Sequence, residues 1–337
     1  MTSKALIVGL SGPRLLDAER AFLRSAAPWG LILFARNVES PDQVRALVAD
    51  ARAVLGWRAP VLIDQEGGRV QRLRPPHWPQ YAPAEVFGAL YARVPKVGLT
   101  AVKLNSRLIA ADLYDLGIDV DCLPVADLRL PEGHGIIGNR AYGETPESVA
   151  AMARSAAQGL LSGGVLPVVK HIPGHGRAPV DSHEHLPVVR AAREELERTD
   201  FAAFRPLANL PLAMTAHVVY AAIDPDRPAT TSPIVMAEVV RGFIGFTGLV
   251  MSDDLSMGAL SGTVASRSLA ALAAGCDMLL HCNGDLAEME AIAAVAPALE
   301  GVALERADRA LAARQTPQPI DIAASRAELA RLIGAPA

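Results

Sequence analysis

Eight short apolar runs, rich in valine, isoleucine and leucine, recur along the 337-residue chain. Within each run the apolar residues stand side by side instead of alternating with polar ones, as is typical of strands buried on both faces of a parallel sheet. We therefore predict strands at residues 5–8, 31–34, 61–63, 120–123, 166–169, 212–214, 249–251 and 278–280.

Segments with helical periodicity separate most of these runs, at residues 17–27, 41–55, 102–116, 145–161, 191–204 and 265–274. Two of them begin with a capping residue followed by proline, Ser40-Pro41 and Thr145-Pro146, which favours a helix start. Strands that alternate with helices indicate parallel β/α architecture, and a count of eight favours a closed barrel over an open doubly wound sheet. We predict an α/β fold, a single-domain (β/α)₈ TIM barrel.

The chain shows no long linker or shift in composition, so we expect one domain over residues 1–337, with a core at about residues 5–312. The C-terminal extension 313–337 mixes proline and glutamine with one more helical stretch and should pack outside the barrel. Hydrophobic residues make up 51% of the chain and charged residues 20%, which suffices for a large core and argues against disorder.

Charge and cysteine content narrow the class of partner. The net charge of −4 gives no reason to expect nucleic acid. The three cysteines are widely spaced and form no CxxC pair, so they are no disulfide framework and suit a reducing compartment. No run approaches the ~20 apolar residues of a membrane span, and the first apolar stretch is too short for a signal peptide. We expect a cytoplasmic monomer that binds a small molecule.

Polar clusters follow almost every predicted strand. The C-terminal ends of barrel strands converge on one face, where active sites lie, and ionisable groups at several strand ends have no obvious packing purpose. The pattern therefore indicates an enzyme. The clusters are Arg36-Asn37, Asp64-Gln65-Glu66, Lys170-His171, Thr215-Ala216-His217, Ser252-Asp253-Asp254 and His281-Cys282-Asn283.

A segment from residue 170 to residue 187 holds four of the eight histidines, and its glycines and prolines predict a long loop after a strand. Three interpretations stay open. The histidines are zinc ligands, although their spacing matches no common zinc motif. Alternatively they hydrogen-bond the loop, which we expect for His175 and His185. In the third, Asp181 holds one ring nitrogen of His183 and leaves the other free for proton transfer.

The predicted strand 249–251 delivers two successive carboxylates, Asp253 and Asp254, at its end. Side chains of successive strand residues diverge, so one carboxylate is expected to face a reaction centre while the other anchors a loop. Capping of the following helix by both is the alternative. A carboxylate nucleophile with a separate acid/base is the chemistry of retaining glycosidases.

Residues 133–138 match the dinucleotide-binding pattern GxGxxG, but the sequence around them does not fit that motif. They follow a proline-containing loop, open no helix and lack the acidic residue about 20 positions later, because residue 158 is glutamine. We therefore expect no nucleotide cofactor.

Three motifs in this order closely resemble the single-domain β-N-acetylglucosaminidases of glycoside hydrolase family 3, the bacterial cytoplasmic enzymes of peptidoglycan recycling. They are Ile63-Asp-Gln-Glu-Gly-Gly-Arg-Val-Gln-Arg72, Lys170-His-Ile-Pro-Gly-His-Gly with Asp181-Ser-His183, and Ser252-Asp-Asp-Leu-Ser-Met257. The resemblance covers residues 31–283. Its departures are mild: Ile172 replaces a usual aromatic residue, and the segment before Asp253 lacks a common polar residue.

The resemblance implies that Asp253 is the nucleophile and that His183 is the acid/base, oriented by Asp181. It also implies contacts to the terminal sugar from Asp64, Arg72, Arg140, Lys170 and His171, although each of them alone also fits a structural ion pair. It implies no metal and no cofactor. Histidine as acid/base departs from the general rule for retaining enzymes and predicts a near-neutral basic limb in the pH profile.

The implied reaction is release of terminal N-acetylglucosamine from peptidoglycan-derived muropeptides, of the N-acetylglucosaminyl-anhydromuramic acid type, through a covalent glycosyl–Asp253 intermediate. Three rivals stay open: a hexosaminidase whose substrate's acetamido group is the nucleophile, a metal-dependent hydrolase that uses the histidine cluster of residues 171–185, and a catalytically silent sugar-binding protein.

Overall fold

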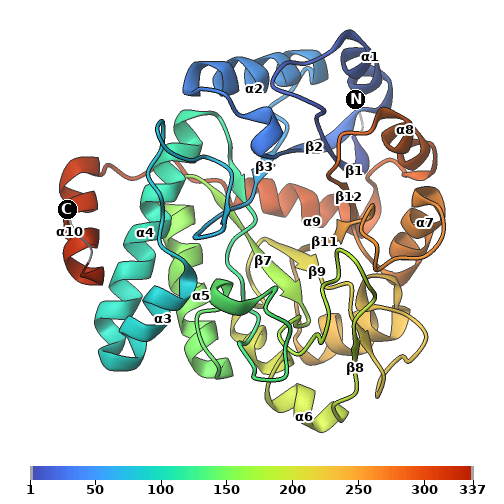
Figure 1. Cartoon of the computed structure of the whole chain (residues 1–337). Coiled ribbons are helices and arrows are strands. Elements are labelled where there is room, and N and C mark those ends of the chain that lie inside the picture. Colours follow the sequence, from blue (N-terminus) through green and yellow to red (C-terminus); the bar gives the residue numbers. More distant parts are fainter. Residues whose placement is uncertain (1–2, 335–337) are drawn as a thin grey trace.

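Eight parallel strands close into a barrel in the computed structural model, which describes residues 3–334 (Figure 1). Each strand pairs with the next along the chain, and β1 closes the ring by pairing with β12. All eight predicted strands are confirmed, with ends shifted by a few residues. The barrel strands are β1 (Lys4–Gly9), β2 (Pro28–Leu33), β3 (Val61–Ile63), β6 (Val120–Asp121), β7 (Leu166–Ile172), β9 (Leu212–Thr215), β11 (Leu249–Asp254) and β12 (Met278–His281).

Helices surround the barrel, one or more after each strand, so the predicted (β/α)₈ barrel is confirmed (Figure 1). The capping residues Ser40 and Thr145 accept hydrogen bonds from the N–H groups of Gln43 and Ser148, as expected of helix starts. The helices are α1 (Asp17–Ala26), α2 (Pro41–Leu55), α3 (Ala84–Arg93), α4 (Pro95–Asp115), α5 (Pro146–Ser162), α6 (Arg193–Arg198), the π-helix η6 (Val235–Phe243), α7 (Val264–Ala274), α8 (Leu286–Val295), α9 (Gly301–Ala312) and α10 (Ile322–Ile333).

Two predicted helices were wrong in extent. The helix expected at 102–116 is α4, which already begins at Pro95, a residue suited to the first turn because it lacks an N–H. The helix expected at 191–204 stops at Arg198 and continues only as short 3₁₀ turns. There the Thr199 hydroxyl lies 2.7 Å from the carbonyl oxygen of Glu195 and 2.9 Å from the Asp200 carboxylate, so this side chain competes with the backbone for helical acceptors.

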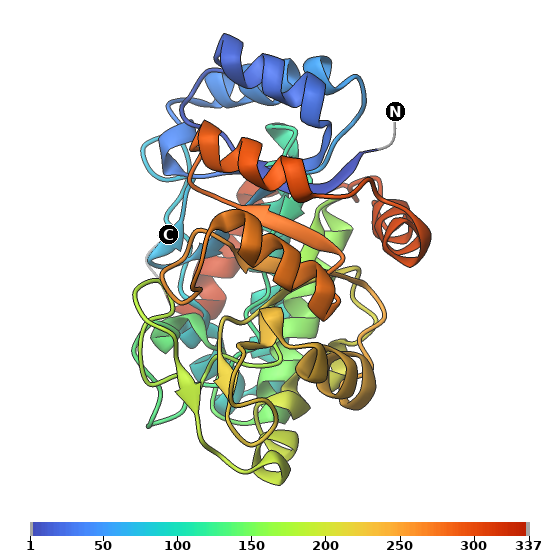
Figure 2. The ribbon, with the colours of Figure 1, turned by 90° about the vertical axis from the view of Figure 1, so that its right-hand side faces the viewer.

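The interior of the barrel is apolar and is closed at one end by α9. Inward side chains such as Ile7, Val168 and Met251 form a cluster with Ala307 and Ala310 of α9. Figure 2 shows α9 at one end of the barrel and the long loops that follow the strands at the other. The barrel therefore has only one face open for a site, the one formed by the C-terminal strand ends.

Two small sheets and a terminal helix complete the fold. β4 (Gln65–Gly67) pairs with β5 (Val70–Gln71) after β3, and β8 (Val188–Val189) pairs with β10 (Val219–Tyr220) beside the histidine-rich loop. α10, which belongs to the expected C-terminal extension, packs against α4. Residues 1–2 and 335–337 of the expected domain lie outside the described residues. Across residues 3–334 no helix is both long and apolar enough to span a membrane.

Close packing of α4 on α5 depends on Gly159. A Cβ at this position would lie 2.3 Å from the carbonyl oxygen of Lys103 in α4. Alanine gains about 1 kcal/mol of helix propensity over glycine, but displacement of a backbone group in a packed core costs about 1–3 kcal/mol. We therefore expect Gly159→Ala to lower the free energy of unfolding by about 1 kcal/mol, the middle of the resulting range, measured by urea denaturation. Gly12→Ala is the control, because a Cβ there meets no atom within 4 Å. Unchanged stability of Gly159→Ala would contradict this packing.

Candidate active site

A cavity of about 430 Å³ opens at the C-terminal ends of the barrel strands. Seven of the eight predicted site residues line it, although they come from five separate segments of the chain. The eighth, Asp181, lies behind His183 and contacts its ring. The structure thus brings together the residues that the sequence placed far apart. Those on the cavity wall are Asp64, Arg72, Arg140, Lys170, His171, His183 and Asp253.

The two carboxylates at the end of β11 have different partners, as expected from the alternation of side chains along a strand. Asp253 lines the cavity, and its Oδ1 accepts a hydrogen bond of 2.8 Å from the N–H of Asp254. The Asp254 carboxylate accepts from the Ser256 N–H and hydroxyl, at 3.0 and 2.6 Å, and from the Cys282 N–H at 3.1 Å. Asp254 therefore fixes the loop after β11 to the end of β12, and Asp253 keeps an oxygen for the cavity.

Asp253 is ionised at neutral pH. Burial alone would raise the pKa of its carboxyl, but the nearby His217, His171 and Lys170, together with the N–H of Asp254, outweigh burial and hold this pKa below its ordinary value. A carboxylate must be deprotonated to act as a nucleophile or to stabilise positive charge. The environment of Asp253 meets that requirement.

His183 lies on the loop after β7 with its ring held from one side. The Asp181 carboxylate accepts from the His183 backbone N–H at 2.9 Å and contacts ring Nδ1 at 2.7 Å. Because a carboxylate only accepts, Nδ1 carries the proton and Nε2 is left free. Burial acts to raise the pKa of Asp181, but the hydrogen bonds and charge of His183 hold it below its ordinary value, so Asp181 remains ionised. The predicted Asp181–His183 contact is present.

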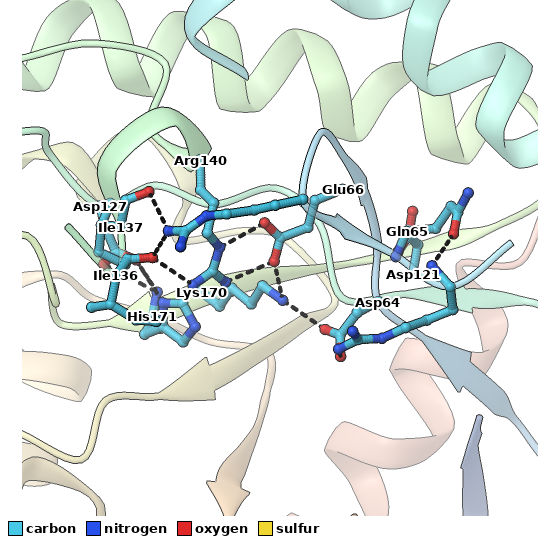
Figure 3. A network of polar contacts seen from close by, with 12 residues as sticks. Asp64, Gln65, Glu66, Asp121, Asp127, Ile136, Ile137, Arg140, Lys170 and His171 are labelled. Atoms are coloured by element: carbon cyan, nitrogen blue, oxygen red, sulfur yellow. Dashed lines mark hydrogen bonds and ion pairs between the residues drawn. The ribbon is translucent and has the colours of Figure 1, made fainter. Parts of the chain in front are cut away.

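A buried chain of ion pairs forms one wall of the cavity (Figure 3). Lys170 Nζ lies 2.7 Å from Asp64 and 2.7 Å from Glu66, and its side chain is 3% exposed. Arg72 contacts the second oxygen of Asp64 at 2.9 Å. Arg140 donates twice to Glu66, at 2.8 and 2.7 Å. Three cations thus hold two carboxylates in fixed positions with hydrogen-bonding groups toward the cavity.

The same contacts keep every member of this chain charged. Burial opposes the charged forms, but Lys170 and Arg72 hold the pKa of Asp64 far below its usual range. Against burial, Arg140 and Lys170 lower the pKa of Glu66 to about 2. The two carboxylates in turn raise the pKa of Lys170 against the effect of burial. These groups are therefore suited to hydrogen bonding and unsuited to proton transfer near neutral pH.

His171 is oriented by Asp127, a residue that the sequence did not single out. Asp127 Oδ2 lies 2.6 Å from His171 Nδ1, and Oδ1 accepts from the His175 N–H at 2.7 Å. Asp127 is fully buried, and its contacts with His171 and His175 hold its pKa below the ordinary value although burial acts to raise it. Its role is therefore to hold the backbone and ring of the segment that begins the histidine-rich loop (Figure 3).

Sequence reasoning missed two further residues at this site. Glu66 stood in a recognised strand-end cluster, but nothing in its spacing pointed to a contact with Arg140, 74 positions away. Phe34, the last residue of a predicted strand, lines the cavity with the guanidinium carbons of Arg36 and Arg72 at 5.0 and 5.1 Å from its ring centroid. A cation over an aromatic face leaves no mark in local sequence.

The other two histidines of the loop, His175 and His185, differ from each other in burial and in hydrogen bonding. His175 is buried, its Nε2 lies 2.9 Å from the Ser182 hydroxyl, and burial lowers its pKa to about 4, which confirms its loop-holding role. The same interpretation of His185 was wrong: its side chain is exposed, and among residues 3–334 it forms a hydrogen bond only through its backbone N–H, to the carbonyl of Asp181. Within the described residues no three His, Cys, Asp or Glu side chains are grouped to hold a metal ion.

Known proteins resemble this chain over most of its length. A model of the glycosyl hydrolase family 3 N-terminal domain matches residues 8–314. The β-hexosaminidase of Alkalilimnicola ehrlichii is 44% identical over 287 residues, which cover 82% of this chain and 80% of that protein. The structure of NagZ from Neisseria gonorrhoeae in complex with N-trifluoroacetyl-D-glucosamine has a TM-score of 0.89 and 31% identity and covers 99% of both chains. A family 3 β-N-acetylglucosaminidase from Paenibacillus sp. str. FPU-7 has a TM-score of 0.82 and 30% identity over 99% of this chain and 62% of that one.

The low pKa of Glu66 predicts how acid weakens the fold. Its folded-state pKa of about 2 lies below the ordinary 4.5, so ionised Glu66 stabilises the protein above pH 4.5 and loses this effect as pH falls toward 2. We expect Glu66→Gln to lower the free energy of unfolding by about 3 kcal/mol at pH 6 and by much less at pH 3. Urea denaturation at several pH values measures the difference.

The exposed Glu305 of α9 provides the control for that experiment. Glu305→Gln should change stability by less than about 0.5 kcal/mol at either pH. A Glu66→Gln difference that is as large at pH 3 as at pH 6 would show that Glu66 acts through packing and not through its charge.

Proposed function

The chain belongs to glycosyl hydrolase family 3 and is a β-N-acetylhexosaminidase, and we propose that it removes terminal, non-reducing N-acetylglucosamine by a retaining mechanism through a covalent intermediate on Asp253. The observation that supports this most is the pairing, in one cavity, of an ionised Asp253 with a histidine whose free Nε2 is set by Asp181. Different neighbours orient the two groups: the Asp254 N–H holds the Asp253 carboxylate, and Asp181 holds the His183 ring. A nucleophile and a separate acid/base need such independent positioning.

In the first step an oxygen of Asp253 attacks the anomeric carbon, and the bond from that carbon to the leaving oxygen breaks. His183, as imidazolium, gives its Nε2 proton to the leaving oxygen. In the second step neutral His183 takes a proton from water, and the water oxygen displaces Asp253 from the anomeric carbon. The sugar is released with its original configuration, and both residues return to their starting states.

The ion-pair wall serves as the binding surface for the sugar in this proposal. Asp64 and Arg72 offer an acceptor and a donor to ring hydroxyls, while Lys170, Arg140 and His171 offer donors to hydroxyl and acetamido oxygens. Small-molecule sites span about 300–1,000 Å³, so a cavity of about 430 Å³ is at the small end. It fits one terminal sugar, which supports exo-action.

We extend the proposal to the source of the sugar. The likeness to peptidoglycan-recycling enzymes, carried by the motifs around Asp64, His183 and Asp253, supports a muropeptide that ends in anhydromuramic acid. The three cysteines are unpaired, which agrees with work in the cytoplasm. We also propose that one chain suffices for activity, because its own residues supply both catalytic groups and the sugar contacts.

Activity on an aryl β-N-acetylglucosaminide tests the proposal directly. We expect purified protein to release the aryl group with EDTA in excess, and Asp253→Asn to lower kcat by about 10³-fold or more. Rapid acid quench and peptide mass analysis should find one N-acetylhexosaminyl group on Asp253. Turnover without this adduct, and little loss in Asp253→Asn, would favour attack by the acetamido group of the substrate. Activity only after zinc is added would favour a metal-dependent hydrolase.

Proton donation by His183 predicts a dependence on the leaving group. We expect His183→Ala to lower kcat/KM by about 10²–10⁴-fold for a phenyl glycoside, whose leaving oxygen needs a proton, and far less for a dinitrophenyl glycoside. Steady-state kinetics on both substrates give the comparison. His185→Ala is the matched control, because His185 is exposed on the same loop, and it should keep wild-type rates. An equal loss on both substrates would remove His183 from the acid role.

A further inference from the structure

Behind Asp253 lie three fully buried polar side chains that the proposed mechanism does not use. They are Thr215 at the end of β9, His217 two residues later, and Thr230 in the 3₁₀ turn η5 (Ala229–Thr231), and each is 0% exposed. A buried hydroxyl or imidazole is costly unless it is hydrogen-bonded, so its partners identify what it holds.

These side chains form an unbroken chain of hydrogen bonds. The Asp253 N–H donates to Thr215 Oγ1 at 3.2 Å, and Thr215 Oγ1 lies 2.7 Å from Thr230 Oγ1. Thr230 Oγ1 lies 2.7 Å from His217 Nδ1, and His217 Nε2 lies 3.0 Å from the carbonyl oxygen of Asp254. The chain therefore begins on the backbone of Asp253 and ends on the backbone of the next residue. We call it the Thr215–Thr230–His217 relay.

The direction of every bond in the relay follows from its two ends. A carbonyl oxygen only accepts, so His217 Nε2 carries a proton. Burial lowers the pKa of His217 and favours the neutral ring, so Nδ1 accepts. The Thr230 hydroxyl lies 3.1 Å from the carbonyl oxygen of Ala216 but only 2.7 Å from His217 Nδ1, and it donates to the nearer acceptor. Thr215 then donates to Thr230, and its oxygen accepts from the Asp253 N–H. All donors point the same way, an arrangement in which each bond polarises the next.

The relay fixes the two peptide groups that flank the Asp253–Asp254 peptide. At one end it accepts from the N–H of Asp253, and at the other it donates to the carbonyl oxygen of Asp254. The peptide between them donates its N–H to Asp253 Oδ1 at 2.8 Å. Its orientation therefore sets the orientation of the carboxylate.

We propose that Thr215, Thr230 and His217 are positioning residues that orient the Asp253 carboxylate for attack by clamping the backbone around it. This inference rests on the proposed role of Asp253 as nucleophile. None of the three side chains lines the cavity, and their hydrogen bonds reach its wall through the backbone of Asp253 and Asp254, so the relay should govern the rate of attack and leave sugar binding almost unchanged. Carboxylate misplacement at a reacting carbon costs rate steeply, because productive geometry is narrow.

Thr215→Val tests the relay, because valine keeps the shape of threonine but cannot accept from the Asp253 N–H. We expect kcat on an aryl β-N-acetylglucosaminide to fall about tenfold, with KM and inhibition by N-acetylglucosamine within about twofold of wild type. The rate of adduct formation on Asp253 should fall by the same factor. Thr215→Ser, which keeps the hydroxyl, should restore kcat to within about threefold.

Thr230→Val breaks the same relay at a residue whose hydrogen bonds in the described chain go to neither Asp253 nor Asp254. It should lower kcat about as much, and the Thr215→Val/Thr230→Val double variant should lose little more than either single variant, because one break already opens the chain. Unfolding midpoints and N-acetylglucosamine inhibition confirm that each variant folds with an intact sugar site. If Thr215→Val does not fold, Thr230→Val with Thr230→Ser as its control decides the question.

The outcomes separate this inference from the proposed function. If Asp253→Asn keeps activity and no adduct forms, the nucleophile assignment fails and the relay's role fails with it. If the adduct forms on Asp253 but folded Thr215→Val and Thr230→Val keep wild-type kcat, only the relay's role is overturned. A rise in KM with unchanged kcat overturns it as well.

Discussion

The arrangement of the site depends on the charge of Lys170, whose side chain is 3% exposed near the C-terminal end of β7. A buried ammonium without partners is too costly to keep in a fold, so carboxylates must meet it. Asp64 and Glu66, which follow β3, supply them across the intervening β6. Each carboxylate then needs a further cation on its outer side, which Arg72 and Arg140 provide. The charge of Lys170 thus fixes four further side chains from two other segments of the chain.

This arrangement also reaches the carboxylate on the other side of the cavity. Lys170 and its neighbour His171 are among the groups that keep the pKa of Asp253 low although burial acts to raise it. The same positive groups that are suited to hydroxyl and acetamido oxygens therefore keep the proposed nucleophile ionised. Substitution of Lys170 would affect both the binding wall and the ionisation of Asp253, because no other cation in the described residues bridges Asp64 and Glu66.

The sequence predicts the fold well where the physical signal is local. All eight strands were found because strands buried on both faces read as unbroken apolar runs. The Asp181–His183 contact spans two residues and was also found. Asp127 was missed because its partner His171 lies 44 positions away and no pattern links them. His185 was misjudged because composition does not distinguish a histidine inside a loop from one on its outer surface.

Partners that are distant in sequence but joined through backbone groups escape prediction for the same reason. Thr215 and His217 belonged to a recognised strand-end cluster, yet Thr230, which joins them, stood in no motif. A threonine chosen for its hydroxyl looks the same in sequence as one chosen for its methyl group. Only the three-dimensional path of hydrogen bonds shows which of the two it is.

The proposed nucleophile lies on a strand and the proposed acid/base on a loop, and these two segments are joined at Gly258. Asp253 lies on a barrel strand, whereas His183 lies on a loop with its side chain 62% exposed. The loop is attached to the segment just after Asp253, because the Gly258 N–H donates to the His183 carbonyl at 3.1 Å. A Cβ on Gly258 would lie 2.8 Å from that carbonyl oxygen, closer than real Cβ atoms come. Glycine at this position therefore lets the loop that carries His183 pack closely against the segment that follows Asp253.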